Sequence, residues 1–177
     1  MPAPGADGGP VPKRRAAPRR AELIDDVGTG AADTQGLSLG PLSEVLGYHI
    51  AQAAVFTYGL FDRHVGQPFG LRKTEYSMLM LLLANGPLSP KRLAQALALS
   101  APNLTMLLDR LQARDLLRRE RSETDRRSQN IVLTAEGERV AKASAAAAAP
   151  MEADLLDRLS PAEHAMLIEL LDKVSGR

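Results

Sequence analysis

Apolar side chains recur at intervals of three and four residues along most of this 177-residue chain, the spacing of helices that bury one face. The regular pattern begins near Leu42. Its first run predicts a helix that Ser43 caps and that extends to about His64. Gly66 and Pro68 follow, and we expect these two residues to stop the helix.

The next run, residues 73–84, is apolar nearly all round and includes six consecutive apolar residues at 78–83. A helix of this composition has no solvent-facing side, so we expect it at the buried centre of the domain. The sequence Asn-Gly-Pro at positions 85–87 is expected to end this helix.

Two short helices joined by a brief connection are predicted next. Ser89 caps the first and is followed by Pro90 at the first helical position, and Ser100 caps the second. The buried stripe of the second helix consists of Leu104, Leu107, Leu108 and Leu111. Its other face exposes small polar side chains near its N-terminus. Such a helix can enter the major groove of DNA, because no bulky side chain holds it away from the bases.

Two strands, at 116–121 and 130–133, are predicted to form a hairpin with a polar tip. Arg126 and Arg127 at this tip can reach into a minor groove, where negative potential is focused. We expect Asp125 to orient a neighbouring arginine. Two helices followed by a hairpin predict a winged helix-turn-helix, so the expected fold class is mainly α with a small β-hairpin wing.

The C-terminal part predicts two more helices. Thr134 caps the first, Pro150 should bend it, and it resumes as far as Arg158. A capping box, Ser160 with Glu163, starts the last helix. The apolar stripe of that helix comprises Met166, Leu167, Leu170, Leu171 and Val174. One protomer can hardly cover such a stripe, which predicts a homodimer; a monomeric helical bundle is the alternative. A two-fold dimer would place its recognition helices about 34 Å apart, one turn of DNA.

The distribution of charge supports a nucleic-acid partner, although the net charge of the chain is only +1. Residues 84–134 carry a net +4, between a neutral segment at 41–83 and a segment at 135–177 with a net −3. A basic middle of this kind fits a polyanion-binding module. Residues 1–41 hold 13 of the 26 Gly and Pro residues and predict a disordered tail. Its basic cluster could add non-specific affinity for DNA, and a purely solubilising arm is the alternative: Lys13, Arg14, Arg15, Arg19 and Arg20.

The amino-acid composition excludes several other classes of protein. The chain has no cysteine, which excludes a disulfide scaffold, a thiolate zinc site, an iron–sulfur cluster and a cysteine nucleophile. The three histidines lie far apart and lack the spacing of metal ligands, so we expect no metal and no cofactor. The longest apolar run, 78–84, is too short to cross a bilayer, and the first residues lack the apolar core of a secretory signal. These features predict a cytoplasmic protein without a membrane partner.

One short motif suggests a different function. Residues 36–40 match the Gly-x-Ser-x-Gly pattern of serine hydrolases, with Ser38 as the nucleophile. That pattern works only between a strand and a helix of a parallel sheet, and here it lies in the predicted tail. A hydrolase that uses Ser38 is therefore one alternative. A winged helix that binds protein instead of DNA is the other.

Residues 42–175 resemble the MarR family of bacterial transcriptional regulators. The resemblance is carried by LSPKRLA at 88–94, by SAPNLTMLLDRL at 100–111, and by DRR at 125–127 with IVLT at 131–134. It implies a disordered tail at 1–41 and a domain at 42–177. In that domain, helices at 42–66 and 135–177 would intertwine into a dimer, and 72–134 would form the winged helix-turn-helix.

In that family the recognition helix reads the major groove of double-stranded DNA, at a pseudo-palindromic operator. Carried over by position, the DNA-binding residues are Ser100, Ala101, Pro102, Asn103, Thr105, Met106, Arg110, Asp125, Arg126 and Arg127. Two positions depart from the family pattern. Asp115 stands where relatives often have Gly, and Asp tolerates the left-handed backbone of such a turn. Met106 stands where relatives often have a polar or basic residue.

The resemblance also implies a pocket for a small aromatic effector, a carboxylate or a phenol, between the dimer helices and the DNA module. The candidate ligand-binding residues are His49, Phe56, Arg72, Lys73 and Tyr76. Each of the five also fits a purely structural role. The expected function is a dimeric, ligand-responsive repressor in the bacterial cytoplasm, associated with the nucleoid when bound. The sequence leaves open whether the effector releases or recruits DNA.

Overall fold

A computed structural model describes residues 36–121 and 129–176 of the chain. Its helical elements are η1 (Gly40–Glu44), α2 (Leu46–Phe61), η2 (Asp62–Gly66), α3 (Gln67–Phe69), α4 (Lys73–Asn85), α5 (Pro90–Ala96), α6 (Ala101–Ala113), α7 (Ala135–Leu156) and α8 (Pro161–Ser175). Two strands, β1 (Leu117–Arg121) and β2 (Gln129–Leu133), form an antiparallel hairpin. The predicted fold class, mainly α with a small hairpin, is confirmed.

The beginning of the first helix differs from the sequence-based expectation. Ser43 lies inside the 3-10 helix η1, where its hydroxyl donates to the carbonyl of Gly40 at 2.8 Å. Helix α2 begins after Val45 and has no side-chain cap. The prediction that Ser43 caps this helix was therefore wrong, because a turn of 3-10 helix already engages its hydroxyl.

The prediction that Gly66 and Pro68 stop this helix was also wrong. α2 continues through η2, a π-helical turn, into α3, and Pro68 lies in the first turn of α3. Proline is tolerated there because the π turn directly before it already interrupts the regular α-helical hydrogen-bond pattern. The segment ends at Gly70, whose φ is 59°. The N–H of Leu71 donates to the carbonyl of Gly66 at 3.0 Å, as in a Schellman ending.

Helix α4 lies at the centre of the core, as predicted. Met78, Leu79 and Leu82 are buried, and the helix packs against α7 and β2. It ends at Asn85, and Gly86 follows with a φ of 69°. Burying three such side chains stabilises the fold by about 1.5–3 kcal/mol each.

The hairpin is joined to the helical core by one further backbone pairing. In the hairpin Leu117 pairs with Leu133 at the base, and Arg121 pairs with Gln129 at the far end. Leu88, which precedes α5, bridges to Ile131 through two hydrogen bonds of 2.8 and 3.1 Å. The base of the wing is therefore fixed to the start of the helix-turn-helix.

The two C-terminal helices begin as the sequence predicts. The hydroxyl of Thr134 accepts a hydrogen bond from the N–H of Gly137 at 2.9 Å, and Ser160 caps α8 in the same way with Glu163. α7 is one continuous helix through Pro150, where the sequence suggested an interruption and a second part to Arg158. Whether Pro150 bends it stays a prediction.

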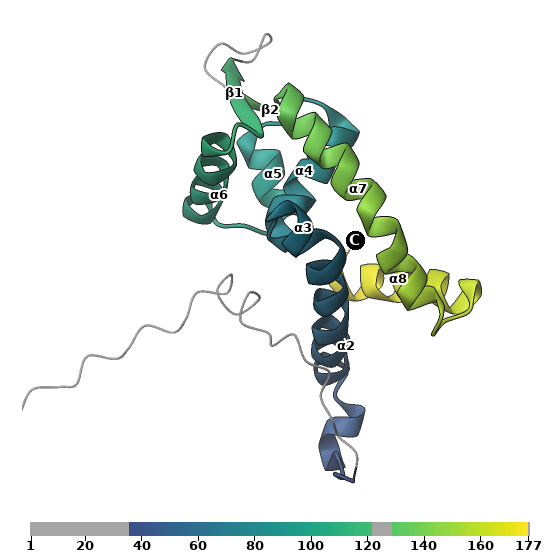
Figure 1. Cartoon of the computed structure of the whole chain (residues 1–177). Helices are drawn as coiled ribbons and strands as arrows, with labels where there is room; N and C mark the ends of the chain where they lie inside the picture. The colour runs from purple at the N-terminus through teal and green to yellow at the C-terminus, as the bar shows by residue number, and fades with distance from the viewer. Residues whose placement is uncertain (1–35, 122–128, 177) are drawn as a thin grey trace, which may run out of the picture.

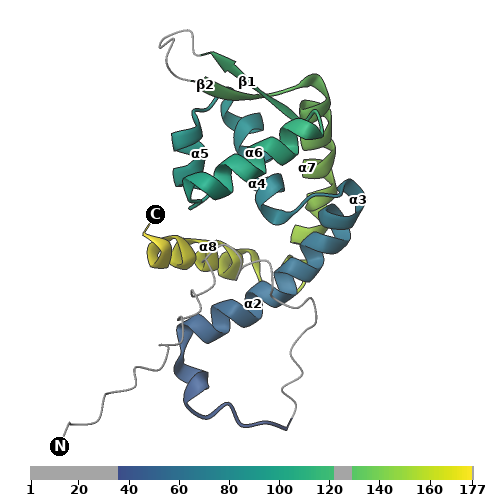
Figure 2. The same ribbon diagram turned by 90° about the vertical axis from the view of Figure 1, so that its left-hand side faces the viewer.

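These elements form a compact module with a helical extension. Figure 1 shows α4, α5, α6 and the hairpin grouped together, with α7 descending from the hairpin along one side. In both Figure 1 and Figure 2, α2 and α8 lie at the end of the molecule opposite the hairpin. The helix-turn-helix and the two helices predicted to dimerise therefore occupy separate ends of the protomer.

Candidate DNA-binding surface

Helices α5 and α6 meet through a tight turn that fixes their relative orientation. The hydroxyl of Ser89 caps α5 by accepting from the N–H of Arg92 at 3.4 Å. After α5, Ala98 adopts a φ of 52°, and the N–H of Leu99 donates to the carbonyl of Ala94 at 2.9 Å. Ser100 is the N-cap residue of α6, but its hydroxyl makes no capping hydrogen bond, contrary to prediction. The hydroxyl is therefore not engaged with the start of the helix.

The start of α6 presents a surface of mostly small side chains, and the opposite face of the helix is held in the core. Leu104, Leu107, Leu108 and Leu111 are all buried, which confirms the predicted stripe. Ala101, Pro102 and Thr105 are exposed, and Asn103 is half-buried. The side chain of Met106 is also exposed, at 60%. Small side chains with leucines behind them allow this surface to approach another molecule closely.

Arg110, a DNA-binding residue carried over by position, pairs with the core in this structure. Its guanidinium donates from Nη1 to Oε1 of Glu75 at 3.1 Å, an ion pair with a residue of α4. The pair couples the recognition helix to the core. Sequence reasoning missed it because the partners are 35 residues apart and Glu75 lies in an otherwise apolar helix.

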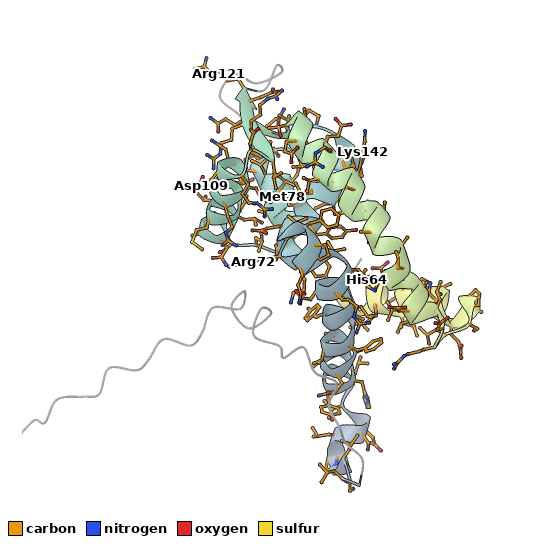
Figure 3. The ribbon with its side chains drawn as sticks, in the orientation of Figure 1. His64, Arg72, Met78, Asp109, Arg121 and Lys142 are labelled. Atoms are coloured by element: carbon orange, nitrogen blue, oxygen red, sulfur yellow. The ribbon has the colours of Figure 1, made fainter. Side chains whose placement is uncertain are left out.

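The far end of α6 is tied to the wing. Nη2 of Arg119, on β1, pairs with Oδ1 of Asp109 at 2.5 Å. Figure 3 shows Asp109 on the outer side of α6 and Arg121 at the far end of β1. The predicted wing residues Asp125, Arg126 and Arg127 lie outside the described residues.

The turn between α6 and the wing is built as the sequence suggested. Asp115 adopts a φ of 55°, so it takes the left-handed conformation that was expected of it. Its carbonyl accepts a hydrogen bond from the hydroxyl of Thr134, the residue that also caps α7. Through Thr134, the end of the recognition helix and the start of α7 share one anchor.

The five candidate ligand-binding residues are not all neighbours. His49 is exposed near the start of α2, where its Nε2 lies 2.8 Å from the carbonyl oxygen of Ser43. The other four lie nearer the α2–α4 junction, Phe56 on α2 and the rest at the start of α4: Phe56, Arg72, Lys73 and Tyr76. The structure therefore separates His49 from this group.

Aromatic rings and cations meet at that junction. The ring of Tyr76 packs edge-on against Phe61, with centroids 5.6 Å apart. Nζ of Lys73 lies 3.7 Å from the ring centroid of Tyr58, and the guanidinium of Arg158 lies 4.2 Å from that of Phe56. Contacts of this kind stabilise by about 0.5–1 kcal/mol each where they are exposed.

Further polar residues near the junction were not found by sequence reasoning. Burial, together with the nearby charge of Glu152, raises the pKa of the Tyr76 phenol, so this group stays a neutral hydrogen-bond donor at neutral pH. Glu152 also faces His164 at 3.7 Å, and His64 pairs with Asp154 at 3.1 Å. These residues come from four segments distant in sequence, and no local motif marks them.

Ser38 precedes η1 and is exposed. Its Oγ accepts a hydrogen bond from the N–H of Gly40 at 3.3 Å. The sheet that the structure describes is an antiparallel hairpin and does not adjoin this segment, so the strand-to-helix setting of a hydrolase nucleophile is not seen around Ser38 in the described residues.

Two kinds of feature are absent from the described residues. Among them, no group of three or more His, Cys, Asp or Glu side chains is placed to hold a metal ion. None of the helices in the described part is both long enough and apolar enough to cross a membrane.

A helix-turn-helix whose second helix exposes a small polar face, followed by a hairpin, defines a winged helix-turn-helix protein. The model of the MarR family matches residues 69–128. The regulator PecS of Dickeya dadantii is 35% identical over 121 residues, which cover 65% of this chain and 73% of PecS. The chain belongs to the MarR family and is a transcriptional regulator.

Other relatives agree with this assignment. A putative regulatory protein for the hcr operon of Thauera aromatica is 27% identical and covers 81% of this chain and 86% of its own length. The repressor CouR, solved bound to a 23-mer DNA duplex, superposes with a TM-score of 0.73 at 30% identity. That match covers 78% of this chain and 98% of CouR.

Proposed function

We propose that this chain is a homodimeric repressor that binds a pseudo-palindromic operator through α6 and the wing and that a small aromatic carboxylate or phenol releases from DNA. The proposal rests on one observation, the contrast between the two faces of α6. Four leucines fix one face in the core, and the start of the other face is small and exposed. A helix so held can enter a major groove without distorting its own domain.

Relatives favour DNA over protein as the partner. CouR is described as a transcriptional repressor and was solved with a DNA duplex. A winged helix that binds only protein has no need of arginines in the wing or of a basic segment at 84–134. DNA binding by this surface accounts for both.

The exposed apolar residues favour a dimer. Helix α8 has no buried residue in the protomer, and its exposed apolar side chains are Met166, Leu167, Ile168, Leu170, Leu171 and Val174. Near the start of α2, Leu42, Val45, Leu46 and Ile50 are exposed as well. Soluble monomers rarely leave so many large apolar side chains in water.

The aromatic effector is favoured by the chemistry of the α2–α4 junction. Neutral Tyr76 supplies a hydrogen-bond donor, and Lys73 supplies a cation beside an aromatic ring. A phenolic or carboxylate ligand needs such groups beside apolar walls. CouR, 28% identical in its complex with p-coumaroyl-CoA, is a relative solved with a phenolic ligand.

Replacing one wing arginine tests the DNA-binding part of the proposal. We expect Arg127→Ala to weaken binding of the duplex upstream of the gene and to reduce the slope of log K against log salt by about 0.9 for each lost phosphate contact. Lys142→Ala removes the same charge from the side of the module away from Asp109, as Figure 3 shows, and is the control. Unchanged mobility shifts for Arg127→Ala would contradict the wing assignment.

A ligand panel tests the effector. We expect at least one small aromatic carboxylate or phenol to raise the Tm of the protein and to dissociate its DNA complex in a mobility-shift assay. Tyr76→Phe, which removes the hydroxyl of this half-buried phenol, should reduce this response, and Tyr48→Phe near the start of α2 should not. A panel that shifts neither Tm nor DNA binding would argue against an aromatic effector.

A further inference from the structure

Glu75 is the one charged residue that the described part of the fold buries; its exposure is 1%. It lies in the first turn of α4, where Oε2 accepts the backbone N–H of Arg72 at 2.9 Å. This bond satisfies one exposed donor at the start of the helix. A glutamine or a serine could cap the helix equally well, so capping alone does not explain a buried charge.

Arg110 on α6 and Arg114, the residue that follows α6, converge on the same carboxylate. Nη1 of Arg110 donates to Oε1 at 3.1 Å, and Nη1 of Arg114 lies 3.7 Å from Oε2. Arg114 also donates to the carbonyl of Phe69 at 3.0 Å and to that of Gly70 at 2.8 Å. One carboxylate therefore joins the second half of α6 to the α3–α4 connection.

The carboxylate supplies directionality that the leucine face of α6 lacks. Apolar contacts hold a helix against a core without strongly fixing its rotation, because the hydrophobic effect has no direction. Charge-assisted hydrogen bonds are short and directional. Burying an ion pair adds little to stability, and its better-attested role is to select one arrangement.

The hydrogen bond with Glu75 also withholds the guanidinium of Arg110 from DNA. Sequence-independent affinity rises with the number of cationic side chains that reach phosphates. Arg110 and Arg114 are 39% and 35% exposed, so both are near the protein surface, yet each is paired with Glu75. Without the carboxylate, the guanidinium of Arg110 would be released toward solvent, whereas Arg114 would still be held by the carbonyl oxygens of Phe69 and Gly70.

We propose that Glu75 is a positioning residue that sets DNA specificity. Its carboxylate fixes the rotation of α6 against the core and keeps Arg110 from non-specific phosphate contacts. This inference rests on the proposed DNA-binding function of α6. It predicts that losing the carboxylate lowers affinity for the preferred sequence and raises affinity for unrelated duplex.

The test compares wild-type protein with Glu75→Gln on two duplexes. One is the duplex that the wild type selects from a randomised library, and the other is a scrambled duplex of equal length and composition. We expect Glu75→Gln to lower the ratio of the two affinities by about tenfold or more, the equivalent of one bidentate base contact. Affinity for the scrambled duplex should rise, with a salt slope steeper by about 0.9 per added phosphate contact.

A control separates positioning from charge and from folding. Glu138→Gln makes the same change in charge at an exposed site on α7, where the partner is Lys142. It should leave the affinity ratio unchanged. A loss of folded protein would lower both affinities by the same factor, so the ratio reports specificity alone.

Every outcome of this comparison either supports or overturns the inference about Glu75. A ratio for Glu75→Gln that equals the wild-type ratio overturns the inference and leaves DNA binding intact. If the wild type selects no sequence, the proposed function fails, and the inference fails with it. Should Glu75→Gln not fold, Glu75→Asp is used, which keeps the charge but withdraws the carboxylate by one methylene. The same fall in ratio supports the inference, and an unchanged ratio overturns it.

Discussion

The contact between α7 and the turn after α6 leaves no space for a side chain at position 137. A Cβ built on Gly137 would lie 1.7 Å from the carbonyl oxygen of Leu116. The atoms in the way are backbone atoms of Leu116, and Gly137 is itself part of a helix, so neither segment can easily move aside. Gly137 therefore allows the start of α7 to pack directly on the turn that supports the recognition helix.

We expect Gly137→Ala to lower the free energy of unfolding by about 3 kcal/mol, since the added methyl group must push two backbone segments apart. Chemical denaturation measures the change. Gly47→Ala is the control, because no atom of the protomer lies within 4 Å of a Cβ there. A Gly137→Ala protein as stable as wild type would contradict the close packing.

At the scale of the elements, the start of α8 depends on one carboxylate. Oε2 of Glu163 accepts hydrogen bonds from both the N–H and the hydroxyl of Ser160, each at 2.8 Å. These bonds lower the pKa of Glu163. The folded state therefore prefers the charged carboxylate more strongly than the unfolded chain does.

The resulting stabilisation is present above the ordinary pKa of a glutamate and is lost as the pH falls through the lowered pKa of the folded protein. We expect wild type to have a higher Tm than Glu163→Gln at pH 7, and the difference to shrink in acid. A difference in Tm that is independent of pH would count against the role of the charge.

Local rules predicted the elements that have local causes. Ser89, Thr134 and Ser160 start their helices at the expected residues, because a cap involves only three neighbouring positions. Asp115 shows that a left-handed turn can be inferred from residue type. The bounds of α4 and the leucine stripe of α6 were predicted for the same reason.

Other features depend on partners distant in sequence. The π-turn at η2 carries the first helix past Gly66 and Pro68, which by composition alone indicate an end. The bridge from Leu88 to Ile131 is a single-residue pairing with no alternation to reveal it. In the candidate site, the exposed face of α6 was predictable, but the diversion of Arg110 toward α4 was not.

At the scale of the whole molecule, the exposed apolar faces of α2 and α8 set the expected assembly. Both helices lie at the end of the protomer opposite the hairpin, as Figures 1 and 2 show. An interface there would leave both DNA-binding surfaces free. A pair of protomers would then present two recognition helices to one duplex.

We expect Leu167→Asp with Leu171→Asp to give a monomer, because two charges one helical turn apart would be buried in the interface. Affinity for the selected duplex should fall by about 10²–10⁴-fold with the loss of the second binding site. Light scattering and mobility shifts measure the two effects. Ala162→Asp adds a charge to the exposed first turn of α8 and should change neither. A dimeric double variant would place the interface elsewhere.

The direct passage from β2 through Thr134 into α7 has a mechanical consequence. The 22 residues of α7 form one continuous helix, an arm about 33 Å long between the hairpin and α2. Tilting such an arm by about 6° at one end displaces the other by about 3.4 Å, the rise of one base pair. Small movements of α7 where it contacts α2 would therefore become larger movements at the hairpin. Such a displacement would put the hairpin out of register with the base pairs of the operator.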